Sequence, residues 1–185
     1  MDAKSNPFRS ARVEALAFRA VPGVDPFAVL ARAGFRGLIA GPKGSGKTTL
    51  LEQLRARLEG QGTPVAHLRL NTDDRARTFS LARWADAQDP AGLWILDGAE
   101  QMSWPDRLRL RRILHRPARG FLVTSHRPLT GIPLLLETRT TPALLADLLR
   151  ELDPAWSGPS AADLFARHRG NLRLALIEAY EHRSR

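Results

Sequence analysis

Eight consecutive residues, Gly41 to Thr48, constrain this 185-residue chain more than any other stretch. They read Gly-Pro-Lys-Gly-Ser-Gly-Lys-Thr and fit the pattern G-x-x-x-x-G-K-S/T at every fixed position. The apolar run at 35–40 predicts a buried strand before them, and residues 49–58 carry apolar side chains at helical spacing after them. Strand, glycine-rich turn and helix together predict a loop whose amides surround a phosphate. The alternative is a glycine-rich turn that arose by chance.

The residue types in this stretch suit that chemistry. Glycine permits the tight turn, and the helix that follows directs the positive end of its dipole at the loop. Lys47 can reach the β- and γ-phosphates of a nucleotide, and the Thr48 hydroxyl can bind Mg²⁺. The stretch resembles the Walker A motif of P-loop NTPases. The predicted phosphate-binding residues are Gly41, Pro42, Lys43, Gly44, Ser45, Gly46, Lys47, Thr48 and Thr49.

A second apolar run, 93–96, ends in Asp97 and predicts a buried strand with a carboxylate at its carboxyl edge. Ligands bind at that edge in open α/β sheets, and a buried carboxylate needs a partner or a metal. This strand resembles a Walker B strand, and the resemblance implies that Asp97 and Thr48 hold Mg²⁺. The alternative is an aspartate that caps the next turn.

One residue departs from the pattern of many ATPases of the additional-strand class, which place a catalytic glutamate directly after that aspartate. This chain has Gly98 there, and its nearest acid is Glu100. A bend at Gly98 would bring Glu100 to the γ-phosphate as the base that polarises water. If Glu100 is instead a helix-start carboxylate, hydrolysis is slow or needs a partner.

The apolar strand predicted at 120–126 also ends in polar side chains, and Thr124, Ser125 and His126 are candidates to contact the γ-phosphate or the attacking water. One of them resembles a sensor-1 residue. His126 is also similar to the switch histidine of ABC ATPases, although the chain has no LSGGQ-like signature. An ordinary hydrogen-bonded histidine is the alternative.

The final 45 residues predict three helices, with Thr141 and Ser160 as N-caps. The last begins with Gly170-Asn171-Leu172-Arg173, which is similar to the G-N-x-R segment of AAA+ lids. The resemblance implies that Arg173 is a sensor-2 residue reaching the γ-phosphate; a surface arginine is the alternative. Oligomeric AAA+ ATPases usually carry an arginine finger at the end of a helix between the strand that corresponds to 120–126 and the next strand. In this chain the corresponding loop, 127–133, is too short to contain a full helix. Candidate substitutes are Arg116, Arg119 and Arg127.

These patterns predict an α/β fold: a three-layer P-loop NTPase core with a mostly parallel sheet, followed by a small C-terminal all-α lid. We expect the core at 1–140 and the lid at 141–185, with residues 1–34 as an N-terminal leader or linker. Within that leader, Asp25-Pro26 predicts a helix start. Residues 13–18 fit either a strand or a helix.

Charge points to the class of partner. The chain carries a net +9, yet residues 141–185 balance six arginines against six acids. Residues 104–127 hold seven arginines and one aspartate, a net of +6. Such a segment suits an acidic partner such as nucleic acid, while a solvated arginine-rich face is the alternative. No apolar run approaches the ~18 residues of a membrane span, there is no secretory signal, and no cysteine is present, so we expect a cytoplasmic protein.

The expected function is that of a Mg²⁺-dependent ATP-binding protein and ATPase, resembling AAA+ ATPases, that switches conformation on a protein or nucleic-acid partner. Hydrolysis is expected to be weak if Gly98 marks a lost base. Two alternatives stay open: a P-loop kinase for a nucleoside or other small molecule, and a nucleic-acid-binding regulator with little hydrolysis.

Overall fold

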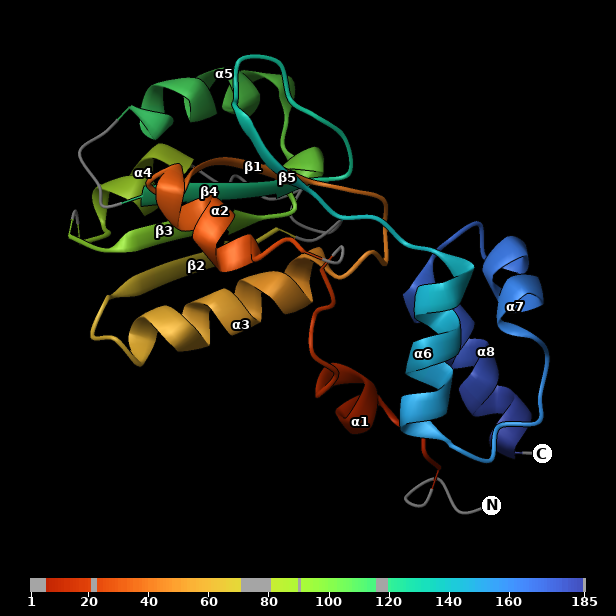
Figure 1. Ribbon diagram of the computed structural model, residues 1–185. Helices are drawn as coiled ribbons and strands as arrows, with labels where there is room; N and C mark the ends of the chain where they lie inside the picture. Colours follow the sequence, from red (N-terminus) through yellow and green to blue (C-terminus); the bar gives the residue numbers. More distant parts are fainter. Residues whose placement is uncertain (1–5, 21–22, 71–80, 90, 116–119, 185) are drawn as a thin grey trace.

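The computed structural model describes residues 6–20, 23–70, 81–89, 91–115 and 120–184. Its α/β part contains a five-stranded sheet in the order β2-β3-β4-β1-β5 (Figure 1). The strands are β1 Arg36–Ala40, β2 Val65–Arg69, β3 Leu93–Asp97, β4 Gly120–Ser125 and β5 Leu134–Glu137. Every pair of neighbouring strands is parallel, so all five carboxyl ends lie at one edge.

Helices cover both faces of this sheet, as the predicted three-layer core requires. One face carries α2 (Pro26–Arg32) and α3 (Lys47–Glu59), and the other carries α4 (Leu81–Asp86) and α5 (Trp104–Leu114) (Figure 1). Alternate strand residues serve the two faces: Trp94 and Phe121 pack with α4 and α5, whereas Ile95 and Leu122 pack with α2 and α3. This alternation follows from the two-residue period of a strand. The predicted fold is therefore confirmed.

A helical bundle follows the sheet. It consists of α6 (Pro142–Leu152), α7 (Ala161–Arg167) and α8 (Leu172–Ser184) around their own apolar cluster. Thr141 accepts a hydrogen bond from the Leu144 amide at 3.1 Å, and Ser160 accepts one from the Asp163 amide at 3.1 Å. Asp25 caps α2 in the same way, through the Phe27 amide at 2.9 Å. The three predicted N-caps are confirmed.

The first part of the segment expected as a leader or linker lies against the helical bundle. It forms a short helix, α1 (Ser10–Glu14), beside the bundle (Figure 1). Phe8 is 3% exposed within the bundle's apolar cluster, with its ring 5.1 Å from that of Trp156. The Asn6 amide donates to the Tyr180 carbonyl and to the Ser184 hydroxyl, each at 2.9 Å. Three helices bury little apolar area by themselves, which is the physical reason for this addition.

Other expectations concern loops. Residues 126–133 contain no helix, as predicted from their length. Two of the candidate arginine fingers, Arg116 and Arg119, lie outside the described residues. Within the described ranges, no helix is both long and apolar enough to cross a membrane.

Phe8 provides the first prediction. We expect Phe8→Ala to lower the free energy of unfolding by about 3–5 kcal/mol, because it leaves a cavity in the bundle's apolar cluster. Urea denaturation followed by tryptophan fluorescence measures this. Arg12→Ala, an exposed position of α1, is the matched control. Equal stability of the Phe8 variant and the wild type would show that residues 6–16 do not belong to the bundle.

Candidate nucleotide-binding site

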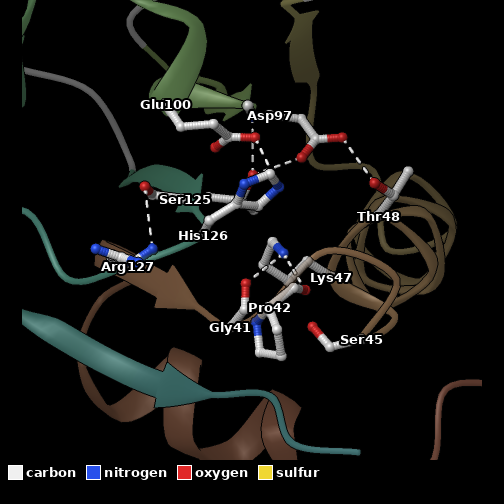
Figure 2. Close-up of polar contacts among 12 residues, drawn as sticks. Gly41, Pro42, Ser45, Lys47, Thr48, Asp97, Glu100, Ser125, His126 and Arg127 are labelled. Atoms are coloured by element: carbon white, nitrogen blue, oxygen red, sulfur yellow. Dashed lines mark hydrogen bonds and ion pairs between the residues drawn. The ribbon is translucent and has the colours of Figure 1, made fainter. Parts of the chain in front are cut away.

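The glycine-rich loop joins β1 to α3 at the carboxyl edge of the sheet (Figure 2). Gly44 and Gly46 adopt left-handed conformations, with φ of 78° and 86°. At Gly44, a Cβ would lie 2.0 Å from the Asn171 Oδ1, which is less than any real contact. The loop therefore needs glycine there both for its turn and for the close approach of the helical bundle.

The Lys47 ammonium lies within the curve of the loop. It donates hydrogen bonds to the carbonyl oxygens of Gly41 at 2.7 Å and Pro42 at 2.9 Å. Burial lowers the pKa of this ammonium, while the Glu100 and Asp97 carboxylates act in the opposite direction. The lysine is thus aimed at the space enclosed by the loop, with two carboxylates nearby (Figure 2).

Asp97 ends β3 and is 5% exposed. Its Oδ2 accepts from the Thr48 hydroxyl at 2.9 Å, and its Oδ1 accepts a short hydrogen bond from the Thr124 hydroxyl. The Arg69 Nε lies 3.8 Å from Oδ2. A buried carboxylate requires such partners. The structure brings Thr48 and Asp97 together as a pair that could hold a metal ion.

A bend at Gly98, expected from the sequence, is present. Gly98 has a left-handed φ of 92°, and a Cβ there would lie 2.8 Å from the Leu70 carbonyl oxygen. The chain then enters a 3-10 turn, η2 (Ala99–Gln101). This turn places the Glu100 carboxylate 3.1 Å from the His126 Nε2, on the side of the site that faces Lys47 (Figure 2). Gly98 thus directs Glu100 into the site; its role as a base stays a prediction.

The three polar residues at the end of β4 have different surroundings. Thr124 is buried and links Asp97 to the Gly98 amide, which donates to its hydroxyl at 2.9 Å. Ser125 is also buried, and its hydroxyl accepts from the Arg127 amide at 3.5 Å. His126 is half-buried beside Glu100, and burial lowers the pKa of its imidazole more than Glu100 raises it. His126 is therefore the member of this group that faces the site (Figure 2).

Arg173 lies in the first turn of α8 and is exposed. The residues just before it contact the α/β part: Asn171 lies against Gly44, and the Gly170 carbonyl accepts from the Thr140 hydroxyl at 2.9 Å. The bundle therefore meets the phosphate loop at the beginning of α8. The sensor role of Arg173 stays a prediction. Pro42 and Lys43 are exposed, and Thr49 is half-buried in α3.

Two contributors were missed by sequence reasoning. The Thr138 hydroxyl lies 2.6 Å from the Ser45 hydroxyl and ties the end of β5 to the loop. Phe18 lies against Gly46, with ring carbons 3.1 and 3.4 Å from where a Cβ would stand. Both line a hollow of about 260 Å³ beside the loop, together with Val24, Pro26 and Leu136. The apolar run at 134–136, which ends two residues before Thr138, was the available signal; Phe18 offered none.

A metal ion could be held by Thr48 and Asp97. Among the described residues there is no group of three or more histidine, cysteine, aspartate or glutamate side chains that could enclose an ion. Mg²⁺ in nucleotide sites takes only one or two protein ligands and completes its shell with phosphate oxygens and water. The hydroxyl and carboxylate, 2.9 Å apart, fit that arrangement.

Comparisons with known proteins agree with this architecture. No protein-family model and no curated protein matches the sequence. Among solved structures, Orc1 of Aeropyrum pernix in complex with DNA is similar with a TM-score of 0.62 and 18% identity, over 96% of this chain and 63% of that one. Cdc6p of Pyrobaculum aerophilum gives 0.63 and 15%, over 97% and 64%.

AMPPCP-bound DnaA of Aquifex aeolicus is similar with a TM-score of 0.56 and 17% identity, over 85% of this chain and 61% of that one. This chain spans about three fifths of the length of these structures. At such low identity the likeness concerns the fold. These neighbours are AAA+ P-loop ATPases, and the chain has their fold.

Proposed function

We propose that this chain is an ATP-binding protein and Mg²⁺-dependent ATPase that uses nucleotide to switch its contacts with a nucleic-acid or protein partner. One observation carries the proposal. Two separate stretches of the chain converge around the glycine-rich loop at one sheet edge, one carrying Lys47 and Thr48 and the other Asp97 and Glu100. This constellation is the set of groups that phosphoryl transfer to water requires.

Nucleotide binding uses the loop and the hollow beside it. Loop amides and the N-terminus of α3 bind the phosphates, and the Lys47 ammonium exchanges its two carbonyl partners for phosphate oxygens. The base lies in the hollow next to Phe18 and Val24, which is apolar enough to accept an aromatic ring. Adenine is favoured because DnaA, one of the similar structures, was solved with AMPPCP.

Thr48 and Asp97 would hold Mg²⁺. When bound, the ion neutralises charge that develops on the phosphate oxygens. The protein's own contribution is to hold the Thr48 hydroxyl and the Asp97 carboxylate next to each other. Thr124 does so by binding Oδ1, which leaves Oδ2 facing Thr48.

Glu100 orients and polarises the attacking water. Its carboxylate raises the pKa of the Lys47 ammonium and therefore faces it, whereas the Asp97 carboxylate is bound by Thr48 and Thr124. His126, 3.1 Å away, holds this carboxylate when no nucleotide is bound. The contact also favours a second candidate function, a nucleotide-gated regulator with little turnover, in which Glu100 never leaves His126.

The helical bundle is the moving part. Asn171 contacts the loop at Gly44, and Arg173 follows two residues later in the first turn of α8. Nucleotide bound at the loop therefore changes the position of α8. Orc1, one of the similar structures, was solved in complex with DNA, which supports a nucleic-acid partner here.

Lys47 supplies the test of nucleotide binding. We expect Lys47→Ala to weaken ATP binding roughly 10- to 100-fold, because a charged hydrogen bond to phosphate is lost. Titration with a fluorescent ATP analogue measures it. Lys43→Ala removes the same charge from an exposed position of the same loop and should weaken binding less. Equal losses in the two variants would mean that net charge alone is responsible.

Glu100 supplies the test of hydrolysis. We expect Glu100→Gln to retain ATP binding and to lose about 100-fold or more in turnover, the usual contribution of a general base. Phosphate release with Mg²⁺ measures this, with Glu52→Gln on the exposed face of α3 as the control. Binding without turnover, alike in wild type and Glu100→Gln, would establish the regulator instead.

His126 makes turnover depend on pH. Because its pKa lies below the ordinary value, His126 is neutral at pH 7 and becomes protonated only below about pH 6.5. Protonation of His126 converts its 3.1 Å contact with Glu100 into an ion pair. The Glu100 carboxylate then stays with His126 and does not bind the attacking water. We expect turnover to fall as pH drops below about 6.5, and His126→Asn to shift that fall to lower pH. An unchanged profile in the variant would exclude this control.

A further inference from the structure

The α5 part of the arginine-rich segment forms one side of a groove on the α5 face of the sheet. The groove has a volume of about 290 Å³ and lies between α5 and the loop after β4. Its lining includes Trp104, Arg107, Leu108 and Arg111 from α5, and Pro128 and Leu129 from the loop. None of these residues belongs to the nucleotide site.

The apolar part of this groove is open to solvent. Trp104 is 73% exposed and Leu108, one helical turn later, is 41% exposed, whereas Leu110 and Ile113 on the inner side of α5 are buried. An indole is among the largest apolar side chains and usually has at least part of its surface covered. A tryptophan and a leucine at i, i+4 on an open groove mark a contact surface.

Within the part of the chain that the structure describes, the arginines of the groove have no carboxylate partner. Arg107 donates to the Glu100 carbonyl at 3.0 Å, and Arg111 to the Thr130 carbonyl at 2.6 Å. Both acceptors are neutral. Among the residues that the structure describes, the one ion pair of an α5 arginine joins Arg109 to Asp106. The groove therefore presents positive charge beside an exposed aromatic ring, and Arg127 adds a further exposed cation next to Pro128.

We propose that this groove binds single-stranded nucleic acid. This assignment names the chemical class of the partner in the proposed function and the surface on which that partner binds. Trp104 offers a face on which a base can stack, and guanidinium groups suit phosphate and stack on bases as well. Arg107 and Arg111 stand one turn apart on α5, about 5–6 Å at Cβ, so that neighbouring phosphates of an extended strand can reach both. A duplex keeps its base faces covered and would leave Trp104 without a partner.

Arg107 connects the groove to the nucleotide site. Its guanidinium holds the main chain of Glu100, the residue proposed to polarise water. A phosphate that draws Arg107 toward the groove loosens this hydrogen bond and frees η2 to reposition Glu100 away from His126. Binding in the groove and hydrolysis are therefore linked, and nucleotide must in turn change the affinity of the groove. This step alone rests on the proposed ATPase function.

The binding experiment needs no nucleotide and so stands apart from the ATPase proposal. Anisotropy of a fluorescein-labelled 20-nucleotide mixed-sequence single-stranded DNA is measured at about 50 and 200 mM salt. With three phosphates neutralised, affinity should fall roughly 20-fold between the two. Trp104→Ala should weaken binding about 5- to 100-fold, Trp104→Phe should restore most of it, and Arg111→Ala should weaken it comparably. Arg32→Ala, on α2 across the sheet, is the matched control.

Several outcomes would overturn the assignment. The first is absence of DNA binding at low salt, and the second is an equal loss of DNA affinity in Arg32→Ala and Arg111→Ala. The third is full displacement of the DNA by polyglutamate, combined with an unchanged DNA affinity in Trp104→Ala. A sedimentation dimer that Trp104→Ala dissociates would assign the groove to a second copy of the chain. For the link, saturating DNA should raise ATP turnover several-fold in the wild type and not in Arg107→Leu. If DNA still stimulates ATP turnover in Arg107→Leu, the proposed link between the groove and Glu100 is wrong. The binding of DNA in the groove is judged separately, by the anisotropy experiment.

Discussion

The carboxylate of Asp97 is the interaction on which the geometry of the site depends. It joins α3 through Thr48, β4 through Thr124 and β2 through the nearby Arg69, all at the carboxyl edge of the sheet. At 5% exposure, an unpaired carboxylate would be costly, so the surrounding groups cannot shift independently. The position of the phosphate loop relative to β3, and hence the space between Lys47 and Glu100, follows from this one satisfied charge.

Much of this arrangement was predictable because it depends on local patterns. The glycines of the loop set the backbone conformation at their own positions, and Thr141 caps α6 through an amide three residues later. Both features are as expected. The strands also follow from apolar runs, since a parallel strand covered on both faces is continuously hydrophobic. Asp97 and Thr124 meet at the same sheet edge for this reason, because the ends of the neighbouring parallel strands β3 and β4 coincide.

Contacts between distant segments were not predictable from such patterns. Asn6 and Tyr180 are 174 positions apart, and nothing in the short periodicity near either residue indicates the other. The same holds for Phe18 against Gly46 and for Asn171 against Gly44. In each case one part of the chain covers a surface that another part leaves open. Such pairings depend on which apolar area remains uncovered after the local elements have formed, and that is a property of the whole chain.

Gly98 shows how one backbone conformation relocates a chemical group. Its left-handed φ and the Leu70 carbonyl 2.8 Å from a potential Cβ exclude a larger residue without rearrangement, so a glutamate directly after Asp97 does not suit this turn. The carboxylate comes instead from Glu100, in a turn held at one side by His126 and through its carbonyl by Arg107. A base directly after β3 would be fixed by the strand. Under the proposed function, the base in η2 lies between the nucleotide site and the α5 groove, where both can influence it.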